Sequence, residues 1–437
     1  MVKKIFCVLF CILIVFSAAV PAVAYEPSGF TVNARSALLV CLDTNETLFS
    51  KNENDRVYPA SITKIMSVLI MLESDGYDPD RMVTMSNEVN KLIEGTGSAV
   101  SGLKVGEQIT CRDLLYFVLM ASYGDCAYLL SLEFGGTVDN FVDMMNAKAK
   151  ELGLSSTHYA NPVGLHDSQN YTTAADTLVL TKYALKNADF KTVCESSRYT
   201  VPKTNMSPSR TISTTNFLQD TTTNYYYVYA KGVKTGFTDE AGRCLVSTAS
   251  YNGYNYMCIL FKCDNAVPRN EFVDSRNLYR WAFNNFAYKQ IANSENPVAE
   301  IPIELSFERD SIPLYVKEGF VSVLPKNADD STIKIIPKLN KSVDAPVKKG
   351  QKIGTADIVY AEKVLGTVDL IAGENVKKST LLSILRTLKR ILSSTYVKVL
   401  LFAAGILIIV FIIAVLRLNK GRNKKRKVKY IPNDRKK

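Results

Sequence analysis

Two long apolar runs, one near each end of the chain, stand out from the mixed pattern between them. The first extends from Ile5 to Val20, after a basic start and before the small residues Ala22-Val23-Ala24. This order predicts a secretory signal peptide over residues 1–24, although a buried first helix would share the apolar pattern. The second run, residues 399–416, contains no charged residue and is long enough to cross a bilayer, so it is predicted to form a transmembrane helix.

From residue 25 to about 290 the apolar positions change between strand and helix spacing. A short apolar strand at Ser36–Cys41 is followed by a turn at Asp43-Thr44-Asn45. Helical spacing predicts helices over 61–72, 111–134 and 138–152, strands return near 225–233, 243–250 and 254–261, and a helix follows over 270–286. Strands at both ends with helices between them predict one sheet flanked by helices, which is an α/β (α+β) domain over residues 25–290.

Residues 297–372 are predicted to form a small β-rich domain. Short apolar runs broken by turn residues occur there at 301–307, 312–316, 333–337, 353–361 and 363–371. Residues 377–397 then place leucine and isoleucine at helical spacing with basic residues on the other face, which is typical of a basic amphipathic linker. Such a helix suits either a membrane interface or a solvated spacer.

The formal net charge of +11 is concentrated at the C-terminus. Residues 417–437 contain eleven Lys or Arg and one acidic residue, Asp434, and a tail of this kind is retained in the cytoplasm. Without this tail and the basic start of the chain, the remainder is close to neutral, so no nucleic acid partner is expected. The sequence therefore predicts a single-pass protein whose main part lies outside the cytoplasm.

Seven of the nine cysteines follow the predicted signal peptide. They form no Cys-x-x-Cys pair, so a zinc site is not expected. Their odd number and their apolar surroundings, as in residues 256–260, favour buried free thiols. One or two disulfide bridges formed after export remain an open alternative.

The spacing Ser-x-x-Lys occurs three times, starting at Ser61, Ser101 and Ser331. Residues three apart share a face of a helix but lie on opposite faces of a strand, so a helix is needed for the amine to accept the hydroxyl proton. Ser61 follows Pro59-Ala60 and opens an apolar helix, whereas Ser101 lies in a loop and Ser331 precedes a strand. Ser61 and Lys64 are therefore the candidate nucleophile and base, although a serine in this place is also a common helix N-cap.

Two more segments have patterns that suit a site. Lys231–Thr238 has the pattern of a strand edge whose glycine lets a substrate approach the backbone closely, and it also fits an ordinary turn. Ser122-Tyr123-Gly124-Asp125 lies within the predicted helical region, where by itself it would indicate only an irregularity in a helix.

Taken in order, the three motifs resemble the Ser-x-x-Lys, Ser-x-Asn and Lys-Thr-Gly motifs of the low-molecular-mass penicillin-binding proteins, the serine-type D-alanyl-D-alanine carboxypeptidases. Five further segments look like landmarks of that family: Tyr58-Pro59-Ala60-Ser61, Asn161-Pro162-Val163-Gly164-Leu165, Gly232-Val233-Lys234-Thr235-Gly236, Asp239-Glu240-Ala241-Gly242 and Ala345-Pro346-Val347-Lys348-Lys349-Gly350. The last resembles the family's C-terminal β domain.

The resemblance implies a penicillin-binding/β-lactamase-like transpeptidase domain, a small all-β domain and one C-terminal transmembrane helix in the bacterial cell membrane. It implies removal of the terminal D-alanine from peptidoglycan stem peptides ending in D-Ala-D-Ala, with β-lactams as inhibitors. No cofactor and no metal are expected.

The resemblance also gives each matching residue a role. Ser61 is the expected nucleophile, Lys64 its base and Ser122 a proton relay. To act as a base, Lys64 needs a lowered pKa, which burial and the nearby charge of Lys234 would provide.

The substrate-binding side is expected along one strand. Lys234 and Thr235 are expected to hold the substrate carboxylate, and Gly236 and Phe237 continue the same strand. The backbone N–H groups of Phe237 and of the nucleophile are expected to form the oxyanion hole. Arg269 either adds a second cation near the carboxylate or is an ordinary surface arginine.

Gly124 departs from the family pattern, which has an asparagine whose amide bonds the substrate's peptide carbonyl. Loss of one such hydrogen bond costs about 1–3 kcal/mol unless another group replaces it, and Asp125 and Tyr123 are the nearest candidates. The alternative to an efficient enzyme is therefore a weakly active or inactive penicillin- or wall-peptide-binding pseudoenzyme.

Two other enzyme classes fit less well. A β-lactamase is disfavoured because the chain lacks a Glu-x-x-Leu-Asn deacylation motif and has a tether and a β domain. A Ser-His-Asp hydrolase is disfavoured because His158 and His166 are the only histidines and no Gly-x-Ser-x-Gly elbow occurs. His166 directly follows the Asn161–Leu165 landmark, so it either lines the cleft or has a structural role.

Overall fold

The computed structural model describes residues 25–424, with side chains described as far as Leu418. The expected signal peptide and most of the expected cytoplasmic tail lie outside the described residues. The chain divides into two compact units. Of the described residues, the first unit holds 25–291 together with Val321–Thr332, and the second holds Ala292–Phe320 together with 333–424.

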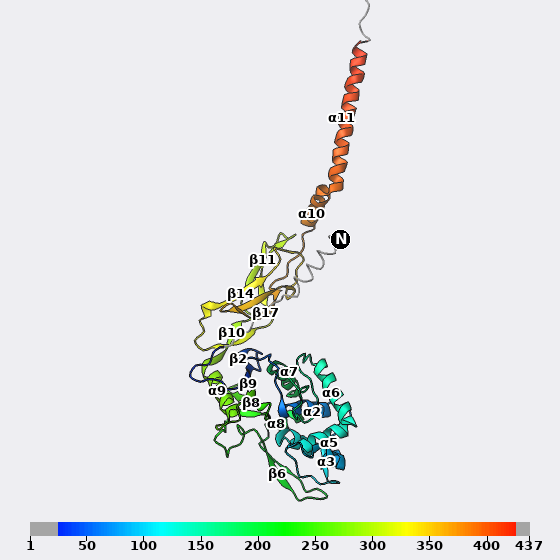
Figure 1. Cartoon of the computed structure of the whole chain (residues 1–437). Coiled ribbons are helices and arrows are strands. Elements are labelled where there is room, and N and C mark those ends of the chain that lie inside the picture. The colour runs from blue at the N-terminus through cyan, green and yellow to red at the C-terminus, as the bar shows by residue number, and fades with distance from the viewer. Residues whose placement is uncertain (1–24, 425–437) are drawn as a thin grey trace, which may run out of the picture. The chain divides into compact units, whose positions relative to one another are not determined.

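A five-stranded antiparallel sheet forms the centre of the first unit (Figure 1). In spatial order its strands are β2 (Thr47–Lys51), β1 (Ser36–Cys41), β9 (Tyr254–Cys263), β8 (Gly242–Tyr251) and β7 (Ala230–Thr238). β1 pairs with β9 so that Leu39 lies opposite Cys258. The beginning and the end of the domain therefore meet inside one sheet, and β7 is left at its edge.

Alternate side chains of β1 face two different cores. Leu38 and Val40 belong to the larger core, whereas Leu39 and Cys41 belong to the smaller one. Because successive side chains of a strand point to opposite faces, both faces of the sheet are covered. The smaller core includes α9 (Asn270–Asn285), and the larger core is built with α2 (Lys64–Leu72), α3 (Asn87–Ile93), α4 (Cys111–Leu115), α5 (Gly124–Gly135), α6 (Val138–Glu151), α7 (Ala174–Ala184) and α8 (Ala188–Glu195).

α2 is the central helix of the larger core, and all nine of its residues are buried, Lys64 included. A single 3-10 turn, η1 (Ala60–Thr63), precedes it. The helix predicted over 61–72 is therefore confirmed. Complete burial of an apolar helix that contains one lysine requires a specific set of partners for the amine.

The region 111–134 is not the single helix that the apolar spacing predicts. α4 runs into a π-helical segment, η2 (Tyr116–Met120), and α5 begins only at Gly124. Between them Ser122 has a positive φ of 65° and Tyr123 is extended, with φ −67° and ψ 130°. The apolar spacing continues across this break, because the residues on both sides of it are buried in the same core.

Several smaller elements were not predicted. The strand expected over 225–233 begins later, at Ala230, because residues 220–229 form turns and a loop closed by their own backbone hydrogen bonds. Two short hairpins are formed by β3 (Met82–Thr84) with β4 (Gln108–Thr110) and by β5 (Arg198–Val201) with β6 (Arg210–Ser213). β10 (Phe286–Ala292) pairs with β13 (Phe320–Pro325) in a third two-stranded sheet.

The second unit contains the predicted all-β domain, a six-stranded sheet. In spatial order its strands are β14 (Ile333–Lys338), β16 (Lys352–Tyr360), β17 (Lys363–Ala372), β12 (Ser311–Val316), β11 (Ala299–Glu304) and β15 (Val343–Asp344). Buried and less buried side chains alternate strictly along β12, as expected for a strand with one face on a core.

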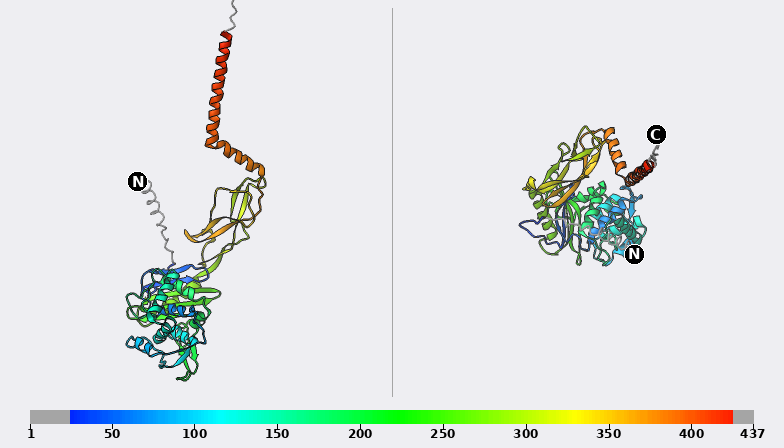
Figure 2. Two further views of the ribbon diagram at one scale, coloured as in Figure 1. Left: turned by 90° about the vertical axis from the view of Figure 1, so that its right-hand side faces the viewer. Right: turned by 90° about the horizontal axis from the view of Figure 1, so that it is seen from above.

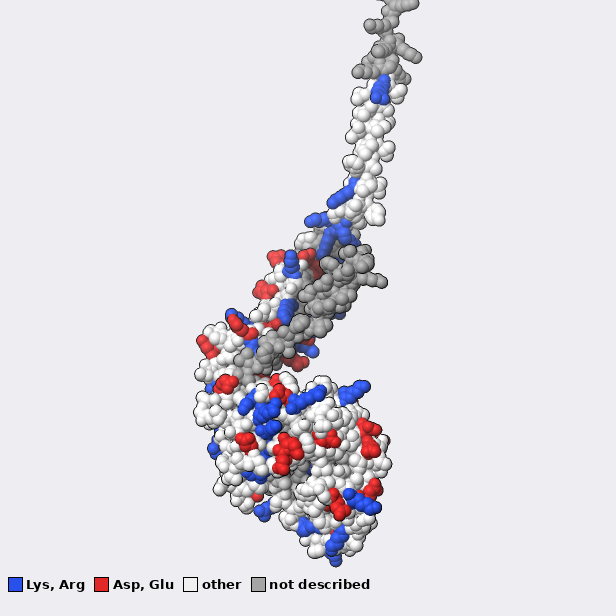
Figure 3. All heavy atoms as spheres, in the orientation of Figure 1, with Lys and Arg blue, Asp and Glu red and all other residues white. Residues whose placement is uncertain are grey.

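Two helices follow this sheet, α10 (Thr380–Ser393) and α11 (Thr395–Lys424), and both can be followed in Figure 2. Thr395–Leu418 of α11 is the one helix of the described chain long and apolar enough to cross a membrane. Within that stretch charged side chains occur only near the ends, at Lys398 and Arg417, and the surface between them is white in Figure 3.

The seven cysteines of the described chain are all buried and all free. The prediction of buried thiols is therefore confirmed.

Candidate active site

Ser61 lies in the turn before α2, and Lys64 is the first residue of that helix. The Lys64 Nζ atom donates hydrogen bonds to Ser61 Oγ at 2.7 Å and to the Val163 carbonyl at 2.8 Å. Lys64 is fully buried, so these oxygens replace the water that an exposed amine would have. The helical spacing of the motif thus places the amine on the hydroxyl, as expected for a nucleophile and its base.

The loop Asn161–Leu165 holds the second partner of Lys64 in place. The side-chain oxygen of Asn161 accepts hydrogen bonds from the backbone N–H groups of Val163, Gly164 and Leu165, at 3.2, 2.7 and 3.0 Å. Gly164 has a positive φ of 87°, and a Cβ there would overlap the carbonyl oxygen of Ala60. Only glycine therefore lets this loop close against the backbone next to the candidate nucleophile.

Burial lowers the pKa of Lys64 to about 7, while the negative charge of Asp125 acts in the opposite direction. The pKa of Lys234 lies well below its ordinary value, first because of burial and second because of the charge of Lys64. Burial is thus the main reason that Lys64 can lose its proton near neutral pH. The nearby lysine is a smaller influence than the sequence suggested.

The edge strand β7 forms the wall opposite the candidate nucleophile. Lys234 Nζ donates to Ser122 Oγ at 2.7 Å, so the strand and the break before α5 are joined by one hydrogen bond. A Cβ on Gly236 would lie only 3.0 Å from the Pro59 carbonyl oxygen and 3.1 Å from the Ser61 nitrogen. The absence of a side chain at Gly236 therefore allows the strand to lie directly beside the turn that carries Ser61.

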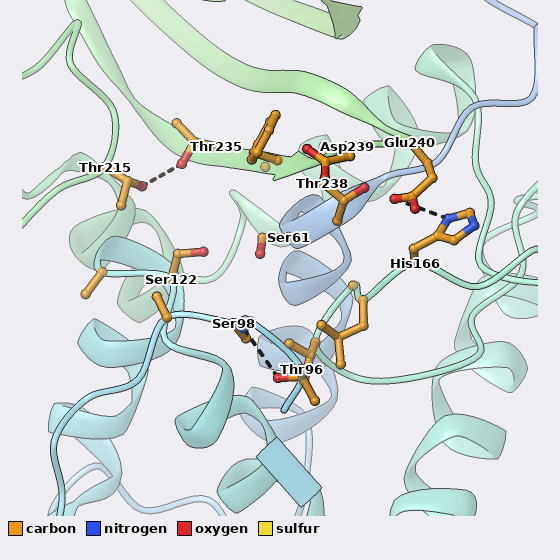
Figure 4. A pocket seen from close by; sticks show the side chains of 18 of the residues that line it. Ser61, Thr96, Ser98, Ser122, His166, Thr215, Thr235, Thr238, Asp239 and Glu240 are labelled. Atoms are coloured by element: carbon orange, nitrogen blue, oxygen red, sulfur yellow. Dashed lines mark hydrogen bonds and ion pairs between the residues drawn. The ribbon is translucent and has the colours of Figure 1, made fainter. Parts of the chain in front are cut away.

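These elements enclose a cleft of about 820 Å³. Figure 4 shows Ser61, Ser122 and Thr235 around the same hollow. Gly236, Phe237 and Arg269 also line it, so six of the eight predicted site residues line the cleft directly. The other two, Lys64 and Lys234, are buried and donate to the hydroxyls of Ser61 and Ser122. The other two Ser-x-x-Lys pairs are elsewhere, since the Ser101 hydroxyl donates to Asp125 and Ser331 belongs to a turn before β14.

Arg269 lines the cleft, but much of its charge is already engaged. Its guanidinium pairs at 2.5 Å with Glu271, which is 1% exposed, and Arg243 lies 3.9 Å from the same carboxylate. The guanidinium also packs over the rings of Phe217 and Phe272, at 4.7 and 4.5 Å. Arg269 is therefore a fixed cation with a buried partner rather than an ordinary surface arginine.

Sequence reasoning missed Thr215. Its hydroxyl lies 2.6 Å from that of Thr235, which fixes the orientation of the Thr235 side chain toward the cleft. The local sequence around Thr215 has no motif, and only the fold brings it beside β7. His166 does line the cleft, with its Nδ1 atom 3.9 Å from a Glu240 carboxylate oxygen and its ring edge-on to Tyr58.

Comparison with known proteins agrees with this geometry. A family model described as D-alanyl-D-alanine carboxypeptidase matches residues 21–265, which is more than half of the chain. The chain belongs to this family of serine peptidases of the penicillin-binding type. A second model, described as penicillin-binding protein 5, C-terminal domain, matches residues 286–378.

Relatives of this carboxypeptidase-family protein extend over most of its length. The D-alanyl-D-alanine carboxypeptidase DacF of Bacillus subtilis is 28% identical over 81% of this chain and 88% of its own. The structure of penicillin binding protein 5 from Haemophilus influenzae, at 24% identity, superposes with a TM-score of 0.65 over 81% of this chain and 100% of its own. The Streptomyces K15 DD-transpeptidase, at 28% identity, gives 0.55 over 59% of this chain and 99% of its own.

The structure also describes the position at which this chain departs from the family motif. The backbone N–H of Gly124 donates to the Ala99 carbonyl at 2.8 Å. Asp125 is 4% exposed and accepts hydrogen bonds from Ser101, and among the described residues neither it nor Tyr123 lines the cleft. The suggestion that Asp125 or Tyr123 replaces the missing amide is therefore not supported, because both side chains lie outside the cleft wall.

Proposed function

We propose that this protein removes the terminal D-alanine from peptidoglycan stem peptides through an acyl-enzyme at Ser61. The main support is the hydrogen bond between a fully buried lysine, whose pKa is lowered to about 7, and the Ser61 hydroxyl. A neutral amine in that place can take the hydroxyl proton, which makes the serine oxygen a nucleophile near neutral pH.

In the proposed acylation, Ser61 Oγ attacks the carbonyl carbon of the penultimate D-alanine and its proton passes to Lys64 Nζ. The backbone N–H groups of Ser61 and Phe237 stabilise the negative oxygen of the tetrahedral intermediate. The C–N bond then breaks, and the leaving amine of the terminal D-alanine takes up a proton through Ser122. Water next attacks the ester carbonyl and the bond to Ser61 Oγ breaks, which releases the shortened peptide with a free carboxyl group and returns a proton to the Ser61 hydroxyl.

The cationic side of the cleft suits a substrate with a free carboxylate. Lys234 is fixed by its bond to Ser122 and by a second bond of 2.9 Å to the Thr235 carbonyl. The Thr235 hydroxyl and the Arg269 guanidinium lie on the same wall. Together these groups would bind the carboxylate of the terminal D-alanine, and the carboxylate of a penicillin would take the same place.

Timed release of D-alanine from a pentapeptide, together with labelling by a fluorescent penicillin, tests this proposal. We expect Ser61→Ala to abolish both signals, whereas Ser331→Ala, the serine of another Ser-x-x-Lys pair, should leave both unchanged. Penicillin labelling that persists in Ser61→Ala would show that Ser61 is not the nucleophile. Labelling of the wild type without release of D-alanine would favour the second candidate, a penicillin-binding pseudoenzyme, for which Gly124 is the motivating observation.

We also propose that residues 1–24 are a signal peptide, that residues 399–416 span the bacterial cell membrane and that residues 417–437 are cytoplasmic. The apolar helix Thr395–Leu418 supports the anchor. Protease added outside spheroplasts should then digest the two units and spare an epitope placed after Lys437. Extraction of the full chain by alkaline carbonate would contradict the proposed span.

A further inference from the structure

The space beside Gly124 is occupied by a side chain from another part of the fold. A Cβ built on Gly124 would overlap the hydroxyl oxygen of Ser98 and would lie 3.0 Å from Ile93 Cδ1. The Ser98 hydroxyl therefore lies within the volume that a side chain at position 124 would fill. The Ser98 hydroxyl can occupy this place because position 124 has no side chain.

The loop that carries Ser98 is tied to α3 on one side of that residue and to α5 on the other. On one side, Thr96 Oγ1 accepts from the Ser98 N–H at 3.3 Å and donates to the Ile93 carbonyl at 2.8 Å. On the other side, the Ala99 carbonyl accepts from the Gly124 N–H at 2.8 Å. Ser98 is thus held over the start of α5 by the backbone of the residue whose side chain is missing.

Asp125 anchors the same loop one step further along. Its carboxylate accepts from the Ser101 backbone N–H at 2.9 Å and from the Ser101 hydroxyl at 2.6 Å. Since Asp125 is 4% exposed, these bonds are shielded from water and hold their geometry more firmly than surface bonds would. The role of Asp125 is therefore to position the loop.

The Ser98 hydroxyl differs from several other hydroxyls of the cleft because it has no side-chain partner among residues 25–418 and can still bond a ligand. Ser98 lines the same cleft as Ser61 and Ser122, and Figure 4 shows it below both of them. The hydroxyls of Ser122, Thr215 and Thr235 are paired with neighbouring side chains. In the described part of the chain, by contrast, no residue forms a hydrogen bond with the Ser98 hydroxyl.

We infer that Ser98 is a substrate-contacting residue whose hydroxyl donates to the amide carbonyl on the acyl side of the bond that Ser61 attacks. This inference rests on the proposed function. One hydroxyl donor then stands in for the missing side-chain amide, and it comes from the 94–101 loop instead of the Ser122 motif. An acyl donor that has no such carbonyl cannot use this contact.

Two β-lactams with the same fused rings separate this role from a merely structural one. Benzylpenicillin has an acyl-amide carbonyl on its ring, and 6-aminopenicillanic acid has a free amine at the same place. We expect Ser98→Ala to lower the second-order rate constant for acylation by benzylpenicillin by about tenfold, the effect of losing one hydrogen bond. The rate constant for 6-aminopenicillanic acid should not change. Equal slowing of both compounds, or slowing of neither, would overturn the inference.

A double variant tests whether the side chains at positions 98 and 124 compete for the same space. Gly124→Asn alone should slow acylation by benzylpenicillin, because the new side chain collides with Ser98. Ser98→Gly together with Gly124→Asn removes the collision and supplies the family's amide, so the preference for benzylpenicillin over 6-aminopenicillanic acid should return to within about threefold of wild type. A folded double variant that reacts with benzylpenicillin no faster than Gly124→Asn would contradict the overlap between the two side chains.

The matched control is Ser168→Ala, which removes an exposed serine hydroxyl from outside the cleft lining. It should leave both rate constants unchanged. Acylation of the wild type at Ser61 tests the proposed function, and the ratio of the two rate constants in Ser98→Ala tests the present inference, so the two can fail separately.

Discussion

The Nζ atom of Lys64 lies 2.7 Å from the Oγ atom of Ser61, and the lysine has no solvent exposure. The two residues are joined by one turn of helix, but the burial comes from elements more distant in the sequence, such as the loop around Val163. The motif therefore sets the distance between the two atoms, and the fold sets the pKa of the amine.

The rate of acylation should rise with pH through the pKa of Lys64. Below about pH 7 the amine carries a proton and cannot accept another, and above it the free amine predominates. The pH profile of kcat/KM for D-alanine release should therefore have an ascending limb with an apparent pKa near 7.

Lys64→Arg is the control for that limb. A guanidinium stays protonated at these pH values, so the variant should lose at least about a hundredfold in kcat/KM and its residual rate should not follow the same limb. A wild-type profile that is flat between about pH 5.5 and 8 would argue against Lys64 as the base.

A methyl group at Gly164 should damage the site more than one at Gly102. Both glycines have positive φ, 87° and 74°, but a Cβ on Gly164 meets the Ala60 carbonyl whereas one on Gly102 has nothing within 4 Å. Gly102→Ala should cost about 1 kcal/mol of unfolding free energy from backbone strain alone. Gly164→Ala should cost more and should also slow acylation by penicillin. Urea unfolding and acylation rates measure both effects, and equal behaviour of the two variants would contradict the close approach.

Removal of the Thr215 hydroxyl should weaken substrate binding. Thr215→Val keeps the shape of the side chain but breaks the 2.6 Å bond to Thr235, so kcat/KM should fall about fivefold, mostly through KM. Thr200 and Thr211 form a similar pair at 3.0 Å on the exposed β5/β6 hairpin, so Thr200→Val is the matched control and should not change the kinetics. The prediction fails if both variants match wild type.

Glu271 should be required for stability because it is buried between two arginines. Glu271→Gln leaves Arg269 and Arg243 near one another without a negative partner, which should lower the unfolding free energy by about 2–4 kcal/mol. Asp80→Asn, which breaks the exposed pair with Arg112, should cost no more than about 1 kcal/mol. Thermal unfolding of both variants checks this prediction. A loss of stability in Glu271→Gln no larger than that in Asp80→Asn would contradict it.

Patterns local to the chain predicted much of this molecule. The strands β1, β8 and β9, the helices α2, α6 and α9 and five of the six strands of the all-β sheet lie close to their expected positions. Their apolar spacing reports directly which face of each element is buried. The fold class and the family are likewise those expected from the order of the three motifs.

Other features depend on contacts that no local pattern records. The interruption of the helix at Ser122 could not be predicted from the sequence, because the residues before and after it keep helical apolar spacing and are buried in the same core. Thr215 and Ser98 reach the cleft only through loops held by partners more than 20 residues away, such as the Met120 and Gly124 backbones. The motif pattern shows that Gly124 lacks the family's amide, but it does not show that Ser98 occupies the space beside Gly124.

The pairing of β1 with β9 has a consequence for how the protein matures. If residues 1–24 are the signal peptide that we propose, β1 cannot complete its sheet until residues 254–263 have also crossed the membrane. Pairings between such distant segments form late in folding. β7, which stands beside Ser61, enters the same sheet through β8. We therefore expect the chain to have no acylating activity during its passage through the export channel, and to acquire it only when nearly the whole first unit has emerged on the wall side.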